Sequence, residues 1–155
     1  MARAEVRTMT LEDYIQSRLD GADGPSADRQ ALARTGAVYL EGGPCYAGFL
    51  DGKLLGVAGI RILWPGVGEA WAVPTGAGRQ AGRAYHRAVR DGYRQIVAQY
   101  HLRRVHAWVP ADFWVGMRWA MALGFMPETA PLKGFGPQGQ DFVLVVQFPN
   151  GKEPV

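Results

Sequence analysis

The clearest pattern in the chain is an apolar stripe at helical spacing between residues 80 and 100. Apolar positions recur there every three or four residues and arginines occupy the opposite face, which predicts a long amphipathic helix. The stripe consists of Ala81, Ala84, Tyr85, Ala88, Val89, Tyr93, Ile96 and Tyr100. Residues 113–123 are apolar on nearly every side, so we predict a second, buried helix there that ends at Gly124.

Shorter apolar runs predict strands on both sides of these helices. Residues 45–50 and 53–63 flank Asp51-Gly52, a pair typical of a tight β-hairpin turn. Further strands are predicted at 4–8, 68–73, 103–109, 128–134 and 141–148, and further helices at 10–19, with Thr10 as N-cap, and at 28–38. The order β-α-α-β-β-β-α-β-α-β-β favours one α/β domain over residues 1–155, with a mixed sheet and helices on both faces.

Composition narrows the class of protein. The 155 residues, 48% of them hydrophobic, suffice for one domain with a sizeable core. No apolar run approaches the length of a membrane span, and one cysteine, Cys45, fits the reducing cytoplasm, so we expect a cytoplasmic protein without a membrane partner. The net charge of +3 is uneven: residues 1–51 hold five basic and eight acidic side chains, and residues 52–155 hold twelve and six. This asymmetry indicates an anionic partner for the C-terminal part.

Residues 74–84, PTGAGRQAGRA, connect a predicted strand to the long helix. A helix N-terminus carries partial positive charge and normally has acidic or hydroxyl residues. Here Arg79 and Arg83 occupy the first turns, and no acidic residue follows until Asp91. A bound phosphate would resolve this conflict, with the glycines letting its oxygens approach the backbone. The alternative is a plain turn with solvated arginines.

Three segments resemble a known family. Residues 79–84, RQAGRA, match the pyrophosphate motif Arg/Gln-x-x-Gly-x-Gly/Ala; residues 118–125, RWAMALGF, are similar to a helix-to-strand corner ending in Leu-Gly-Phe; and residues 134–146, GFGPQGQDFVLVV, are similar to a closing hairpin. On these residues, and on the opening VRTMTLEDY, the chain resembles the GCN5-related N-acetyltransferases, the GNAT superfamily. It is most similar to short GNAT-like proteins encoded by phages, which would place it in the host cytoplasm.

The resemblance implies a mostly antiparallel, twisted sheet with a splayed central pair of strands. It also implies acetyl-CoA as cofactor and direct transfer of the acetyl group to an amine in a ternary complex. The residues that it assigns to the cofactor are Ala72, Val73, Gly78, Arg79, Gln80, Ala81, Gly82 and Arg83. No metal site is expected, because the three histidines lack ligand spacing.

Glu69 is the candidate catalytic residue, because the resemblance places it beside the splayed strands, where a carboxylate could take a proton from the attacking amine. The alternative is a surface glutamate on an alternating strand. Two positions depart from the family pattern. Ala120 stands where many members have the tyrosine that protonates the leaving thiolate, and the loop from Pro74 to Arg79 is about two residues longer than usual.

Five arginines share one face of the long helix. Arg79, Arg83, Arg87, Arg90 and Arg94 are spaced four, four, three and four residues apart. The last three form either a solvated face or a docking surface for an acidic partner or nucleic acid. Alternatives to an enzyme are therefore a catalytically inactive GNAT-fold virion, binding or inhibitory protein, and a nucleic-acid-binding or -modifying protein. The acceptor (small molecule, protein or nucleotide) and the oligomeric state, a homodimer included, stay open.

Overall fold

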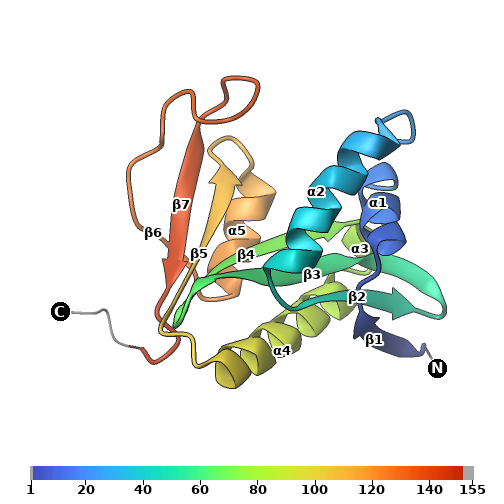
Figure 1. The fold of residues 1–155 in the computed structure, drawn as a ribbon, viewed down its shortest axis with the longest axis horizontal. Coiled ribbons are helices and arrows are strands. Elements are labelled where there is room, and N and C mark those ends of the chain that lie inside the picture. The colour runs from blue at the N-terminus through green and yellow to red at the C-terminus, as the bar shows by residue number, and fades with distance from the viewer. Residues whose placement is uncertain (1, 152–155) are drawn as a thin grey trace.

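The structure, a computed structural model, describes residues 2–151. Its centre is a seven-stranded sheet in the order β1-β2-β3-β4-β5-β7-β6 (Figure 1). The strands span Ala4–Thr8 (β1), Cys45–Leu50 (β2), Lys53–Trp64 (β3), Val67–Pro74 (β4), Arg104–Pro110 (β5), Met126–Pro127 (β6) and Phe142–Gln147 (β7). Neighbouring strands pair antiparallel except for β4 and β5, which pair in parallel. The predicted mixed, mostly antiparallel sheet is confirmed.

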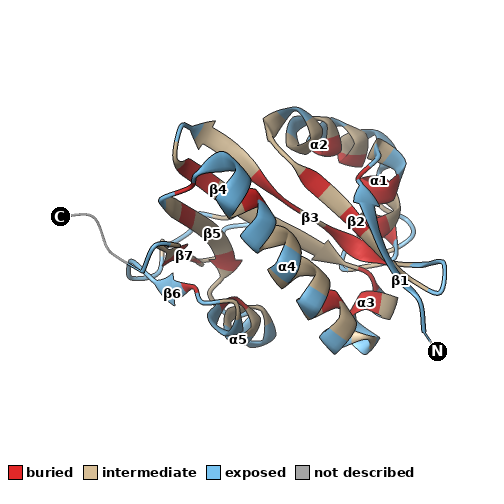
Figure 2. Cartoon of the chain, turned by 90° about the horizontal axis from the view of Figure 1, so that it is seen from below, coloured by how far each residue is buried: buried red, intermediate tan, exposed pale blue. Residues whose placement is uncertain are grey.

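Helices cover both faces of the sheet, as predicted. α1 (Leu11–Leu19) and α2 (Arg29–Gly42) pack on one face, whereas α4 (Gly82–Tyr100) and α5 (Trp114–Ala122) lie on the other (Figures 1 and 2). Each layer has its own core. Tyr14 and Val57 are buried on the α1–α2 side, and Ile60, Ile96 and Val105 are buried on the α4–α5 side.

The first helix begins where the sequence predicts, because Thr10 forms a capping box. Its hydroxyl accepts from the Asp13 N–H, and the Asp13 carboxylate accepts from the Thr10 N–H. Arg7 on β1 also pairs with Asp13 at 2.6 Å, which ties the edge strand to α1. The second helix passes close to α1 at Gly36, where an added Cβ would lie 2.7 Å from the Tyr14 ring.

Two predicted boundaries were wrong. The helix predicted at 28–38 continues to Gly42, because Tyr39 and Leu40 pack against the core on this side of the sheet. The strand predicted at 128–134 is absent from the described chain. Instead β6 is a two-residue strand at Met126–Pro127, and Leu132 makes an isolated bridge to Phe142.

The prediction of a fully buried helix at 113–123 was also wrong. Of the nine residues of α5 only Ala120 is buried, whereas Trp114 and Val115 are 75% and 72% exposed. Figure 2 shows the exposed outer side of this helix beside α4. The helix packs by one face only, although its sequence is apolar all round.

Candidate functional site

β4 and β5 separate along the chain and leave an opening in the sheet. They pair only between Val67–Glu69 and Arg104–His106, although β4 continues to Pro74 and β5 to Pro110. The outer edges of both strands remain paired, β4 with β3 and β5 with β7. The predicted splayed pair of strands is therefore confirmed, and an extended ligand could pair with the two free edges.

Backbone alternation decides which groups of β4 face this opening. The Thr75 N–H donates to the Leu55 carbonyl, and the register of β4 with β3 is unbroken from this pair back through Val73 and Val57. Because residues of an antiparallel strand alternate in direction, Val73 points its N–H and C=O at β3 and Ala72 points its own at β5. Of the two predicted arm-binding residues, Ala72 has the backbone groups available and Val73 does not.

Residues 75–80 form a short helix rather than the open glycine-rich loop that the sequence suggests. Thr75 is the N-cap of α3 (Gly76–Gln80), and its side chain accepts from the Gly78 N–H at 3.0 Å. A Cβ on Gly78 would lie 1.9 Å from the Leu55 carbonyl oxygen, so a glycine is needed to pack α3 against β3. Gly78 is therefore a packing residue, and its N–H is not free for a phosphate, contrary to the prediction.

The N-terminus of α4 lies just beyond α3. Ala81 is the N-cap of α4, and among the described residues no side chain caps this end. The Ala81 N–H itself donates to Ala77, and the first backbone bond that returns to the N-cap carbonyl comes from Tyr85. The N–H groups of Gly82, Arg83 and Ala84 precede that bond and lack helical acceptors.

The residues at this end fit a diphosphate group. The first turn of α4 has no acidic residue, and within the described chain no atom lies within 4 Å of a Cβ built on Gly82. Arg79, Gln80 and Arg83 are exposed, and neither arginine takes part in any ion pair among residues 2–151. Free amides, open space and two free cations are the features that favour an anion at a helix N-terminus.

An apolar cavity of about 340 Å³ lies beside the opening. It reaches the opening at Ala72 and Val109 and is closed on one side by Trp119 and Ala120 of α5. The side chain of Ala70 packs with the cluster on the α4–α5 side of the sheet. Since side chains alternate along a strand, Ala70 and Ala72 face this cavity, and Glu69 and Trp71 face α1 and α2.

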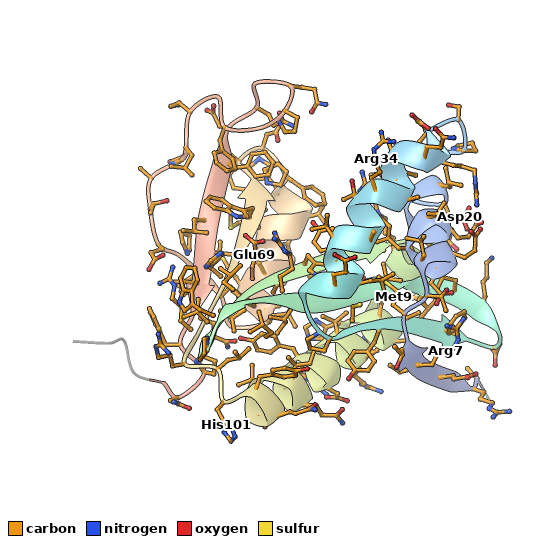
Figure 3. All side chains as sticks on the ribbon, in the orientation of Figure 1. Arg7, Met9, Asp20, Arg34, Glu69 and His101 are labelled. Atoms are coloured by element: carbon orange, nitrogen blue, oxygen red, sulfur yellow. The ribbon has the colours of Figure 1, made fainter. Side chains whose placement is uncertain are left out.

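Glu69 forms the centre of a polar cluster on the α1–α2 face. Its Oε1 accepts from the Trp108 indole N–H at 2.8 Å and lies 3.3 Å from His106 Nε2, while Oε2 accepts from Arg61 at 3.0 Å. Figure 3 shows Glu69 between α2 and the strands β5 and β7. The Glu69 side chain is 17% exposed and its carboxylate is paired, so it is neither the fully solvated surface glutamate nor an unpaired base.

These contacts lower the pKa of Glu69 below that of an ordinary glutamate. The hydrogen bond with His106 has the largest lowering effect, and the Trp108 hydrogen bond and the Arg61 charge add to it, while burial acts in the opposite direction. The carboxylate therefore stays ionised at neutral pH and is a weaker proton acceptor than a free glutamate. The pairing of His106 and Trp108 with Glu69 depends on the parallel β4–β5 register, so no local sequence signal could reveal it.

Ala120, at the position of the missing tyrosine, is buried and offers no proton. Its neighbour Trp119 donates its indole N–H to His86 Nδ1 at 3.0 Å. Since Nδ1 accepts this bond, the proton of a neutral His86 is on Nε2. The contact joins residues 33 positions apart, so local spacing in the sequence does not indicate it.

The arginine row divides between two places. Arg79 and Arg83 belong to the uncapped helix end, whereas Arg90 and Arg94 line a second cavity of about 490 Å³ near the other end of α4, with His101 and Gln147. Arg90 also pairs with Asp91, and Arg87 is exposed. An acidic partner on Arg87, Arg90 and Arg94 stays a prediction.

Among residues 2–151, no group of three or more histidine, cysteine, aspartate or glutamate side chains could hold a metal ion. No helix of this part of the chain combines the length and apolar character needed to cross a bilayer.

Comparison with known proteins finds likeness in structure but not in sequence. No protein-family model matches the chain. No curated protein is significantly similar to it in sequence.

Several solved structures with the same arrangement are described as acetyltransferases. A GNAT-family acetyltransferase from Bacillus anthracis superposes with a TM-score of 0.74 at 14% identity, over 96% of both chains. The ribosomal-protein-S5-alanine acetyltransferase of Vibrio fischeri has a TM-score of 0.69 at 16% identity, over 97% of this chain and 96% of that one. The yncA protein of Salmonella typhimurium, solved with its cofactor acetyl-CoA, has a TM-score of 0.66 at 17% identity, over 97% and 96%. The chain therefore has the fold of the GNAT acetyltransferases.

Proposed function

We propose that this protein is an N-acyltransferase that uses acetyl-CoA or a related acyl-CoA and transfers the acyl group directly to an amine. The observation that carries the proposal is the opening between β4 and β5, which leads from Glu69 at its closed end to the uncapped N-terminus of α4. The five residues of β4 beyond Glu69 span ~17 Å of extended chain. The N-terminus of α4 would hold the diphosphate, the β4–β5 opening would hold the extended arm of the cofactor, and Glu69 would meet the amine at the far end of the same path.

The binding roles follow from the groups that lack partners among residues 2–151. The N–H groups of Gly82, Arg83 and Ala84, with the side chains of Arg79 and Arg83, would hold the diphosphate of the cofactor. The backbone of Ala72 would pair with the arm that enters the slot. Acyl-CoA supplies the acyl group as a thioester, whose carbonyl carbon is open to attack by an amine.

The two faces of the sheet separate the donor from the acceptor. The cavity lies on the α4–α5 side and Glu69 lies on the α1–α2 side, so an amine can approach the opening from the face opposite the cavity. The amine nitrogen forms the C–N bond as the C–S bond breaks, and it gives up a proton. Glu69 is our candidate to orient the amine and to receive this proton, directly or through a water molecule.

A lowered pKa suits Glu69 for holding the amine more than for removing its proton. Oε1 already accepts from Trp108, and it lies beside His106, which leaves Oε2 as the oxygen with a free lone pair. The departing thiolate needs a proton that Ala120 cannot supply, so a water molecule or another side chain must supply it. A thiolate is a good leaving group, and a missing acid slows the transfer without abolishing it.

Calorimetric titration with CoA and acetyl-CoA tests the proposal. We expect both to bind, and we expect Arg83→Ala to weaken both at least about tenfold, because one charged contact to phosphate contributes about 1.5–3 kcal/mol. Arg87→Ala, one turn further along the same row, is the matched control and should bind as the wild type does. A wild-type protein that binds neither compound would refute the transferase and leave a GNAT fold with a non-enzymatic role.

Transfer itself is measured as release of free thiol from acetyl-CoA in the presence of amines. Small polyamines, amino-terminal peptides and aminonucleosides form a suitable first panel, because each class of acceptor carries an amine. Glu69→Gln should reduce thiol release without changing the affinity for CoA. Unchanged turnover in this variant would remove Glu69 from the mechanism while leaving the cofactor site intact.

A further inference from the structure

The apolar cavity extends well beyond the slot between β4 and β5. From Ala72 and Val109 at the opening it continues beneath the sheet to Gly48 on β2 and Val6 on β1. It therefore passes under three neighbouring strands in addition to the splayed pair. Glu5 is the one charged residue of the described chain that lines it.

Small residues on both walls create this space. Ala84, Ala88 and Gly92 follow one another at four-residue spacing, so this row of α4 lines the cavity in three successive turns with nothing larger than a methyl group. Larger side chains of the same helix, Tyr85, Val89, Tyr93 and Ile96, line the cavity beside this row. Gly48, Ala58, Ala70 and Ala72 line it from the sheet. In an ordinary helix-on-sheet interface, large side chains would interdigitate here at crystal-like density.

Two glycines mark where the space is unfilled. Gly48 lies opposite Val6 in the β1–β2 pair, and Gly92 lies in the third turn of α4. Within the described residues, no atom lies within 4 Å of a Cβ built on either glycine. Neither has a positive φ angle, so their backbone conformations do not require glycine. No turn requires glycine at these two positions, and the missing side chains leave the cavity unfilled.

The volume is too large for an acetyl group. An apolar cavity of 150 Å³ in another protein holds a benzene molecule, whose six carbons are three times those of acetyl. The present cavity of about 340 Å³ is roughly twice that size. It is continuous with the opening where the proposed thioester would lie, so an acyl chain attached there would enter it directly.

We infer that the donor is an acyl-CoA with a medium-length acyl chain, in the range of octanoyl, and that the chain occupies the cavity between α4 and strands β1 to β4. This inference rests on the proposed function, because it takes the thioester to lie in the β4–β5 opening. The acyl chain is recognised by burial alone, since the described lining residues offer it apolar surface and no charge apart from Glu5.

Calorimetric titration with CoA, acetyl-CoA and octanoyl-CoA tests the inference. Each buried methylene strengthens binding about fourfold, so six additional methylenes give a ceiling near several thousand-fold. Ordering the chain and incomplete burial reduce this gain, and we expect octanoyl-CoA to bind at least about 50-fold more tightly than acetyl-CoA. In Gly92→Leu the ratio of the two affinities should fall at least about tenfold, because the new side chain enters the same space.

Two further variants complete the experiment. Gln99→Leu adds the same side chain at an exposed position of α4 outside both cavities, and it should keep the wild-type ratio. Gly48→Val fills the cavity from the sheet side and should lower the ratio as Gly92→Leu does, which covers the case that one variant does not fold. Binding of CoA with no preference for octanoyl-CoA over acetyl-CoA would overturn the inference and leave the proposed function standing. Failure of CoA itself to bind would overturn both.

Discussion

Replacement of Gly82 by glutamate should make the protein more stable and its affinity for CoA lower. Gly82 is the first residue of α4, it is exposed, and a Cβ there meets no described atom within 4 Å. Its φ angle is not positive, so a side chain is accommodated without strain. The substitution therefore changes charge and helix propensity at the N-terminus without disturbing the packing.

The expected gain in stability has two parts. Removing glycine from a helix gains up to about 0.8–1 kcal/mol, and less at a helix end. A carboxylate near an uncapped N-terminus adds about 0.3–1 kcal/mol, because the free N–H groups and the helix dipole attract it. The free energy of unfolding should rise by about 1 kcal/mol, which for a chain of this size raises the Tm by about 2–4 °C.

The carboxylate introduced by Gly82→Glu should also lower the affinity for CoA. It would lie among the N–H groups of Gly82, Arg83 and Ala84, where it competes with the diphosphate and repels it. We expect the Kd for CoA to rise at least about tenfold, equivalent to about 1.4 kcal/mol. Added salt should reduce this penalty, because the two charges face solvent at an exposed helix end.

Gly82→Gln is the matched control, since glutamine has the same shape and lacks the charge. Thermal unfolding without ligand and calorimetric titration with CoA would be measured for the wild type and for both variants. Equal CoA affinity of the glutamate and glutamine variants would refute the proposed diphosphate site at the N-terminus of α4. A glutamate variant less stable than the glutamine variant would show that this helix end does not attract negative charge.

Three other substitutions test separate parts of the structure. Gly78→Ala should lower the free energy of unfolding by about 2–3 kcal/mol in urea denaturation, because its Cβ would lie 1.9 Å from the Leu55 oxygen, and a loss below about 0.5 kcal/mol would contradict the packing role. Glu69→Gln should lower the free energy of unfolding at pH 7, because the lowered pKa of Glu69 contributes stability while its carboxylate is ionised. The difference from the wild type should shrink as the pH falls below 4.5, and a difference that does not depend on pH would contradict this contribution of the ionised carboxylate. Trp114→Ser should change the free energy of unfolding by no more than about 0.5 kcal/mol because the indole is 75% exposed, and a core-sized loss would restore the buried interpretation of α5.

Local patterns identified most of the elements correctly. Strand β1, helix α1 with its Thr10 cap and the hairpin at Asp51-Gly52 depend on neighbouring residues, and the structure has them where the sequence predicts. The short helix α3 was missed, although Thr75 followed by Gly78 is a readable N-cap pattern, because three glycines among residues 76–82 favoured a loop. The exposure of Trp114 could not be predicted, because α5 is apolar on nearly every side and its sequence does not indicate which face packs against the rest of the protein.

The candidate site shows the same division between local and tertiary information. The arginines and glycines of residues 79–83 predicted an anion at a helix N-terminus, and the helix does begin at Gly82 without a cap. The sequence could not show which backbone N–H groups are free to bind a ligand. Thr75 engages the Gly78 N–H, and strand alternation turns Val73 toward β3.

The sequence by itself determined the order of the elements, the amphipathic long helix and the conflict of charge at its N-terminus, because each of these depends on residues a few positions apart. The tertiary structure alone decided that Glu69 meets Arg61, His106 and Trp108, and that small residues of α4 face small residues of the sheet across a cavity. The partners of Glu69 are 8, 37 and 39 residues away along the chain. Contacts over such separations depend on strand order and register, which are set by how all the apolar faces are buried together.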